Sequence, residues 1–118
     1  MTVQQCYQAF GGSYEEVISR LRSDERVVRF LLKVLDDGSY KLLCDSIESG
    51  NADEAFRAAH TLKGVCMNLA ITRLAISSSA LTEALRDNRV ISDNLLPLLQ
   101  QVKQDYELTV NSITQLDR

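Results

Sequence analysis

Residues that interrupt helices are scarce in this sequence, which has one proline and five glycines among 118 residues. Four of the glycines fall where an apolar pattern stops, so they separate segments rather than break them. No stretch shows the apolar–polar alternation of a strand, and there is no internal repeat or low-complexity tract. These absences favour an all-helical fold.

Long apolar runs and targeting signals are also missing. No run approaches the ~20 residues needed to span a bilayer. The first six residues, MTVQQC, lack the basic and apolar blocks of a signal peptide. We therefore expect a cytoplasmic protein with no membrane partner.

Neither the charge nor the cysteine content indicates nucleic acid or metal. The 13 Lys and Arg residues against 16 Asp and Glu give a net charge of −3, whereas a nucleic-acid binder usually shows a basic face. The three cysteines form no CxxC pair, which suggests reduced thiols. One histidine with distant cysteines cannot supply the usual tetrahedral ligand set. We expect no nucleic-acid partner and no metal site.

The apolar spacing that is present predicts a series of helices. Ser13, Ser39 and Asn51 are expected to cap three of them at the N-terminus, and Pro97 marks the first turn of the last. Leu42 is expected to face the core. The predicted helices cover residues 3–10, 13–21, 24–35, 39–49, 51–69, 72–86 and 97–116.

The length allows one core and is too short for two. We expect a single domain over 1–118, in which the short N-terminal helices of 1–38 pack on a bundle over 39–118. The link at 70–72 is short, so the helices on either side of it should run antiparallel. The predicted fold is all-α, an antiparallel up-and-down four-helix bundle with short additional N-terminal helices.

The helix over 51–69 carries the only histidine, His60, and a glycine in its interior, Gly64. On a helical wheel, one face collects small or apolar side chains and belongs in the core. Its members are Ala55, Ala58, Ala59, Leu62, Val65, Cys66 and Leu69. His60 and Gly64 lie on the opposite face, together with Asp53, Phe56, Arg57, Lys63 and Met67.

Gly64 needs an explanation, because an interior glycine costs a helix about 1 kcal/mol relative to alanine. It removes a side chain where another backbone could approach His60. Lys63 supplies positive charge within reach of an anion held on the imidazole. A lone imidazole with a cation and a cleared approach indicates a phosphate acceptor more than a general base, which would need a second oriented group.

The other residues of this face suit a docking surface. Phe56 and Met67 place apolar area on both sides of the histidine, although both could instead be edge-of-core residues. Arg57 adds positive charge, although it could instead pair with Asp53 four residues earlier. Cys66 belongs to the core face and is expected to be an inert packing thiol.

The hexapeptide Ala59-His60-Thr61-Leu62-Lys63-Gly64 resembles the H-x-L-K-G signature of histidine-containing phosphotransfer (HPt) domains in two-component phosphorelays. The resemblance extends to chain length and helix order. It implies that His60 is the phosphoacceptor, that Lys63 stabilises the phosphoryl charge, and that Gly64 gives steric clearance for a docking receiver domain. It also implies that the Mg²⁺ of the reaction belongs to the partner receiver, with no cofactor intrinsic to this chain.

Two positions depart from the family pattern. Leu69 is followed by Ala70 where the family often has Leu-Gly, which should only tighten the turn. The family often places a Gln or Glu on the next helix to hydrogen-bond the histidine, and the corresponding position here is Thr82, with Glu83 adjacent. Thr82 is therefore a possible second support for His60.

The resemblance implies a histidine phosphocarrier, monomeric, that accepts a phosphoryl group from a receiver-domain aspartate and passes it to another. A hybrid histidine kinase is a possible further partner. No glycine-rich phosphate loop is present, so no autonomous kinase activity is expected. Two alternatives remain open: a helical module that binds receivers without phosphotransfer, and a helical scaffold unrelated to signalling whose Phe56/Met67 face is an oligomer interface.

Overall fold

The computed structural model describes residues 1–87 and 89–117, and this part of the chain is helical with no strand. Its elements are α1 (Val3–Phe10), α2 (Tyr14–Leu21), α3 (Asp24–Leu35), α4 (Ser39–Glu48), α5 (Ala52–Asn68), α6 (Thr72–Asp87), the short 3₁₀ helix η1 (Asp93–Leu95) and α7 (Leu96–Thr114). The all-helical prediction is confirmed. The helix boundaries agree to within about two residues, and η1 was not predicted.

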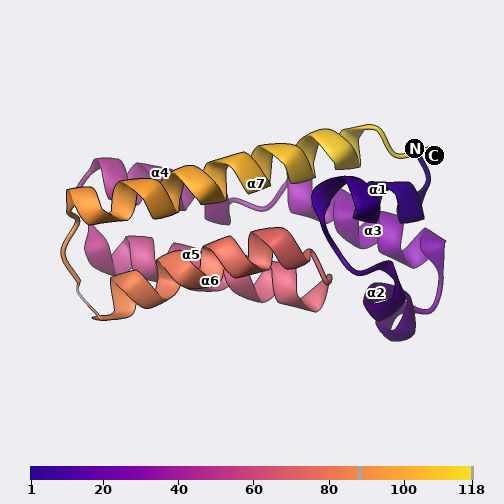
Figure 1. The fold of residues 1–118 in the computed structure, drawn as a ribbon, viewed down its shortest axis with the longest axis horizontal. Helices are drawn as coiled ribbons and strands as arrows, with labels where there is room; N and C mark the ends of the chain where they lie inside the picture. Colours follow the sequence, from indigo (N-terminus) through magenta and orange to yellow (C-terminus); the bar gives the residue numbers. More distant parts are fainter. Residues whose placement is uncertain (88, 118) are drawn as a thin grey trace.

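Four helices, α4 to α7, lie side by side along the 42 Å length of the molecule (Figure 1). The α5 helix packs against both α4 and α6, and α6 packs against α7. The α4 and α7 helices meet through the rings of Tyr40 and Tyr106, which stack with centroids 3.8 Å apart and planes 6° from parallel. The predicted four-helix bundle is thereby confirmed.

The N-terminal helices α1, α2 and α3 gather at one end of the bundle, where both chain termini also lie (Figure 1). The α1 helix packs on α7 and contributes Tyr7 and Phe10 to the core. The buried Tyr7 hydroxyl donates a 2.7 Å hydrogen bond to the carbonyl of Leu69. This contact ties the N-terminal helices to the end of α5.

Small polar residues let the bundle helices approach closely. Their hydroxyls donate to carbonyls one turn back in the same helix, so burial leaves no unpaired donor. These residues are Ser77, Ser78, Thr82, Thr109 and Ser112.

Two of the predicted caps are present and one is not. The side chains of Ser13 and Asn51 accept hydrogen bonds from the backbone of Glu16 and Glu54. The prediction that Ser39 caps α4 is wrong, because Ser39 is the first residue of that helix and its amide donates to Asp37. Pro97 lies in the first turn of α7, as predicted.

The expectation that Leu42 faces the core is also wrong, since this side chain is 44% exposed. The neighbouring Leu43 is fully buried. Successive residues of a helix are turned by roughly 100°, so the register that buries Leu43 turns Leu42 toward solvent. Among the described residues, no helix is long and apolar enough to cross a membrane.

Candidate functional site

The α5 helix sorts its side chains onto two faces, as the helical wheel indicated. The residues buried against the bundle are Ala55, Ala58, Ala59, Leu62 and Cys66. On the opposite side His60 is exposed to solvent. Asn51 fixes the start of this helix, and the two acidic residues of its first turn complement the helix dipole.

The imidazole of His60 is free to react. Within residues 1–87 and 89–117 it takes part in no hydrogen bond and no ion pair. Its one packing partner among the aromatic side chains of this part of the chain is Phe56, whose ring lies 6.0 Å away with planes 7° from parallel. Both ring nitrogens therefore remain available to an incoming group.

Gly64 opens onto free space. A Cβ placed at this position would have no heavy-atom neighbour within 4 Å outside its own helical turn. No neighbouring helix crosses closely here, and Gly64 does not have a positive φ, so the fold itself does not require a glycine. Its cost to helix stability, about 1 kcal/mol, is unexplained by packing within the described chain.

Lys63 lines a shallow groove of about 400 Å³ between α5 and α6. Within the ranges that the structure covers, its ammonium forms no ion pair. The groove is also lined by Met67, Thr72, Ala75, Ile76 and Ser79. Met67 is 53% exposed and Ile76 is 67% exposed, so apolar area is present beside the cation.

Ile76 was not identified from the sequence. It is an isoleucine exposed on a bundle helix. The antiparallel packing of α6 on α5 places it next to Met67 and Lys63. An apolar residue outside the buried stripe of α6 was the signal that could have found it.

Arg57 lies on the other side of α5 from Lys63. Its guanidinium is 3.3 Å from the carboxylate of Glu54, so its pair is with this residue and not with Asp53. It lines a separate groove toward α4, together with Leu42 and Thr61. On the wheel Arg57 and Lys63 flank His60 by roughly 60° on opposite sides.

Phe56 is half-buried, and two arginines cover its ring. The guanidinium carbon of Arg89 is 4.0 Å from the ring centroid and that of Arg86 is 5.1 Å away. Neither arginine was identified from the sequence, because they come from the end of α6 and the segment after it. Their contact with Phe56 is a feature of the His60 region that sequence spacing on α5 alone could not show.

The predicted support of His60 by Thr82 is wrong. Thr82 is fully buried, and its hydroxyl donates a 2.7 Å hydrogen bond to the carbonyl of Ser78 within α6. Glu83 is exposed and pairs with Arg86 at 3.3 Å. The helical register therefore turns Thr82 into the core and gives Glu83 another partner.

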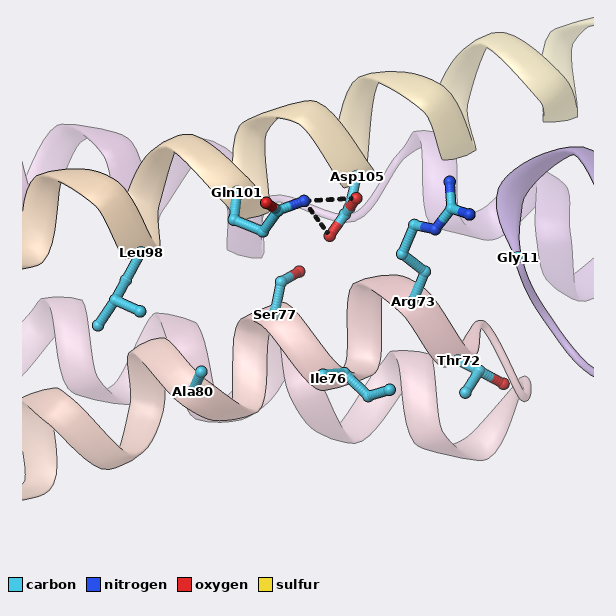
Figure 2. Close-up of a pocket in the computed structure, with 9 residues that line it drawn as sticks. All are labelled: Gly11, Thr72, Arg73, Ile76, Ser77, Ala80, Leu98, Gln101 and Asp105. Carbon is cyan, nitrogen blue, oxygen red and sulfur yellow. Dashed lines mark hydrogen bonds between the residues drawn. The ribbon is translucent and has the colours of Figure 1, made fainter.

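A third groove, of about 450 Å³, lies between α6 and α7, and no residue of α5 is in its wall (Figure 2). Figure 2 shows Gln101 and Asp105 of α7 facing Ser77 of α6, with the Gln101 amide donating to both carboxylate oxygens at 3.2 and 3.3 Å. Thr72 and Ile76 line both this groove and the one beside Lys63. The chemistry of α5 is thus on a different face from this groove.

Ala70, where the family pattern often has glycine, adopts φ 54°. A left-handed backbone is the conformation that favours glycine. The turn between α5 and α6 is held in this conformation by the Ala70 carbonyl, which accepts from the amide of Ser13 at 3.0 Å. The departure at Ala70 thus changes the residue and not the turn.

An exposed imidazole on a helical bundle, with an adjacent lysine and an open glycine, is the arrangement of a histidine phosphotransfer module. A family model described as Hpt domain matches residues 7–111, and the chain belongs to this family. The resemblance seen in the sequence is confirmed. Comparisons with curated proteins and with solved structures gave no match.

Hpt domains are phosphotransfer-capable histidine modules of phosphorelays, and they interact with the receiver domains of response regulators. In the described part of this chain, no three His, Cys, Asp or Glu side chains come together as ligands for a metal ion.

Proposed function

We propose that this chain is a histidine phosphocarrier that accepts a phosphoryl group on His60 from a receiver-domain aspartate and passes it to an aspartate of another receiver. The observation that carries the proposal is the pairing of an exposed, unbonded imidazole with open space at Gly64. Packing within the described chain requires neither feature.

The transfer needs little covalent chemistry from the carrier. A lone pair of one imidazole nitrogen forms the N–P bond while the P–O bond to the receiver aspartate breaks, and the aspartate leaves as a carboxylate. The other ring nitrogen keeps its proton during the transfer. The resulting phosphoimidazolium then releases this proton to solvent. Positioning and charge neutralisation dominate reactions of this kind, and the Lys63 ammonium is available to balance the phosphoryl charge.

The receiver docks across α5 and α6 in this proposal. Met67 and Ile76 offer exposed apolar area beside Lys63, and Gly64 lets a loop of the receiver approach the imidazole. The receiver brings its own Mg²⁺, and the carrier has no kinase activity of its own. It acts in the cytoplasm as a monomer, with a hybrid histidine kinase as a further candidate partner.

The test is incubation of the chain with a panel of phosphorylated receiver domains from the same cell. The wild type should gain an acid-labile, alkali-stable phosphate, and His60→Gln should gain none. A wild type that takes no label from any receiver, yet binds one of them, would favour the alternative of a receiver-binding module without phosphotransfer.

A further inference from the structure

Phe56 connects three groups at the reaction centre. Its ring lies nearly parallel to the His60 imidazole at 6.0 Å, and it also contacts the guanidinium groups of Arg89 and Arg86. Aromatic rings prefer offset parallel arrangements at centroid distances of about 4.5–7 Å. The pair Phe56 and His60 falls within this range, one helical turn apart on α5.

Ion pairs hold the two arginines in place. Arg89 donates to Asp53 in the first turn of α5 at 2.8 Å, and Arg86 contacts Glu83 on its own helix at 3.3 Å. The segment that follows α6 is thereby fastened to the start of α5. Phe56 is covered by this contact, which leaves less of its ring for a docking partner than an open surface position would.

Thr82 donates to the carbonyl of Ser78, so Phe56 is the neighbour that can restrain the imidazole. An exposed histidine side chain on a helix samples several rotamers unless something packs against it. In the described residues, the ring of Phe56 is the aromatic surface that the imidazole can rest on, and the arginines restrict the movement of Phe56 in turn.

The charge of the same arginines is largely cancelled by their carboxylate partners, because Arg89 pairs with Asp53 and Arg86 pairs with Glu83. Their contribution to His60 is therefore through the ring of Phe56, which both guanidinium groups contact.

We infer that Phe56 is the positioning residue of His60, and that Arg86 and Arg89 hold its ring in place. Lys63 and Gly64 then act on the incoming group, while Phe56 sets the orientation of the nucleophile. The inference rests on the proposed function, because it concerns the rate of transfer to His60.

The donor in the experiment is the phosphorylated receiver that transfers fastest to the wild-type chain. Single-turnover transfer rates from this receiver are compared between the wild type and its variants. Phe56→Leu should lower the transfer rate about tenfold, because small misplacements of a nucleophile are costly, while the Kd for the unphosphorylated receiver changes less than twofold. Phe56→Tyr keeps the ring and should restore most of the rate. The double variant Arg86→Gln/Arg89→Gln should also slow transfer, whereas Arg29→Gln, which removes an exposed arginine paired with Glu25 on α3, should not.

Nuclear Overhauser effects between the ring protons of Phe56 and His60 give an independent readout on the wild type. Their presence is expected, and their absence would overturn the inference even if Phe56→Leu proves too unstable to assay. Equal transfer rates for folded Phe56→Leu and wild type would also overturn it and leave the proposed function intact. A wild type that accepts no phosphoryl group would instead refute the proposed function.

Discussion

The residues that define the site are notable for what they lack. His60 has no hydrogen-bond partner in the described chain, Lys63 has no counter-ion there, and Gly64 has no side chain. A residue selected only for stability would fill or pair these positions. Their openness is explained if a second protein supplies the missing contacts during transfer.

Substitutions at Gly64 should separate stability from function. In Gly64→Ala the new methyl group meets open space, so the free energy of unfolding should rise by up to about 1 kcal/mol. Gly64→Gln should keep part of this gain, yet lower transfer to His60 by at least about tenfold, because its side chain occupies the approach of the receiver. Urea denaturation and single-turnover transfer measure the two effects.

The comparison with alanine controls for helix stiffness. Alanine and glutamine are both better helix formers than glycine, so a loss of transfer that is confined to glutamine is steric. If Gly64→Gln transfers at the wild-type rate with every active receiver, the clearance role of Gly64 is excluded.

For single residues, the sequence predicts how side chains that share one helix are arranged. His60, Lys63 and Gly64 share α5, and the period of the helix is enough to place them on one exposed face. Ile76, Arg86 and Arg89 reach the same region only through the packing of α6 on α5, which single-sequence periodicity does not specify. The error at Thr82 has the same origin, because its orientation depends on the rotation of α6 in the bundle.

Among the elements, α5 depends on the N-terminal helices at its C-terminal end. The Arg20 guanidinium on α2 donates to the carbonyls of Met67 and Asn68 at 2.7 and 3.1 Å. These carbonyls belong to the last turn, where the regular i+4 donors of a helix run out, although that of Met67 also accepts from the amide of Ala70 at 3.2 Å. The positive charge also complements the negative end of the helix dipole.

Arg20→Ala should therefore destabilise the protein by about 1 kcal/mol, as expected for partly exposed hydrogen bonds from a charged donor. Arg29→Ala is a matched control, because both arginines pair with a glutamate four residues earlier. Within the described residues, Arg29 donates to no backbone carbonyl. Its effect should stay within about 0.5 kcal/mol. Equal losses in urea denaturation for the two variants would show that the cap on α5 contributes nothing.

The sequence predicted an N-cap correctly where the side chain accepts a hydrogen bond from the backbone of the helix that follows it. Ser13 and Asn51 cap as their positions indicated, while Ser39 does not, because Asp37 two residues earlier takes the role of acceptor. A polar residue at a helix start does not reveal which of several neighbours will cap it. That choice depends on the path of the preceding loop.

For the whole molecule, the fold class and helix order followed from the sequence, since amphipathic spacing and short links leave few arrangements for helices of this length. The position of the N-terminal helices did not follow in detail. They collect at the end of the bundle that holds the α5–α6 turn (Figure 1), and His60, farther along α5, is exposed. This separation lets the core be sealed without closing the site.

The buried core also contains thiols that stay protonated. Burial, assisted by the negative charge of Asp37, raises the pKa of Cys66 to about 12, and burial raises the pKa of Cys6 to about 11. Burial likewise raises the pKa of the Tyr7 hydroxyl. At neutral pH these groups are uncharged in the folded protein, so neither thiol is a nucleophile that competes with His60.

These raised pKa values predict a loss of stability in alkali. An unfolded cysteine ionises near pH 8.5–9, whereas the folded protein retains the Cys66 proton until about pH 12. Above pH 9 the folded state thus binds more protons than the unfolded state, and the free energy of unfolding must fall as the pH rises. Below about pH 8 both states hold the proton, and the thiols contribute no pH dependence.

The titration of these groups should accordingly leave the urea midpoint unchanged between pH 7 and 8 and should lower it from about pH 9 upward. Cys66→Ala should be less stable than the wild type at pH 7, because a buried sulfur is lost. Its stability should decline less steeply between pH 9 and 11, because one of the titrating thiols is gone. Parallel declines for the two proteins would mean that the Cys66 thiol ionises alike in the folded and unfolded states, and would contradict the raised pKa of Cys66.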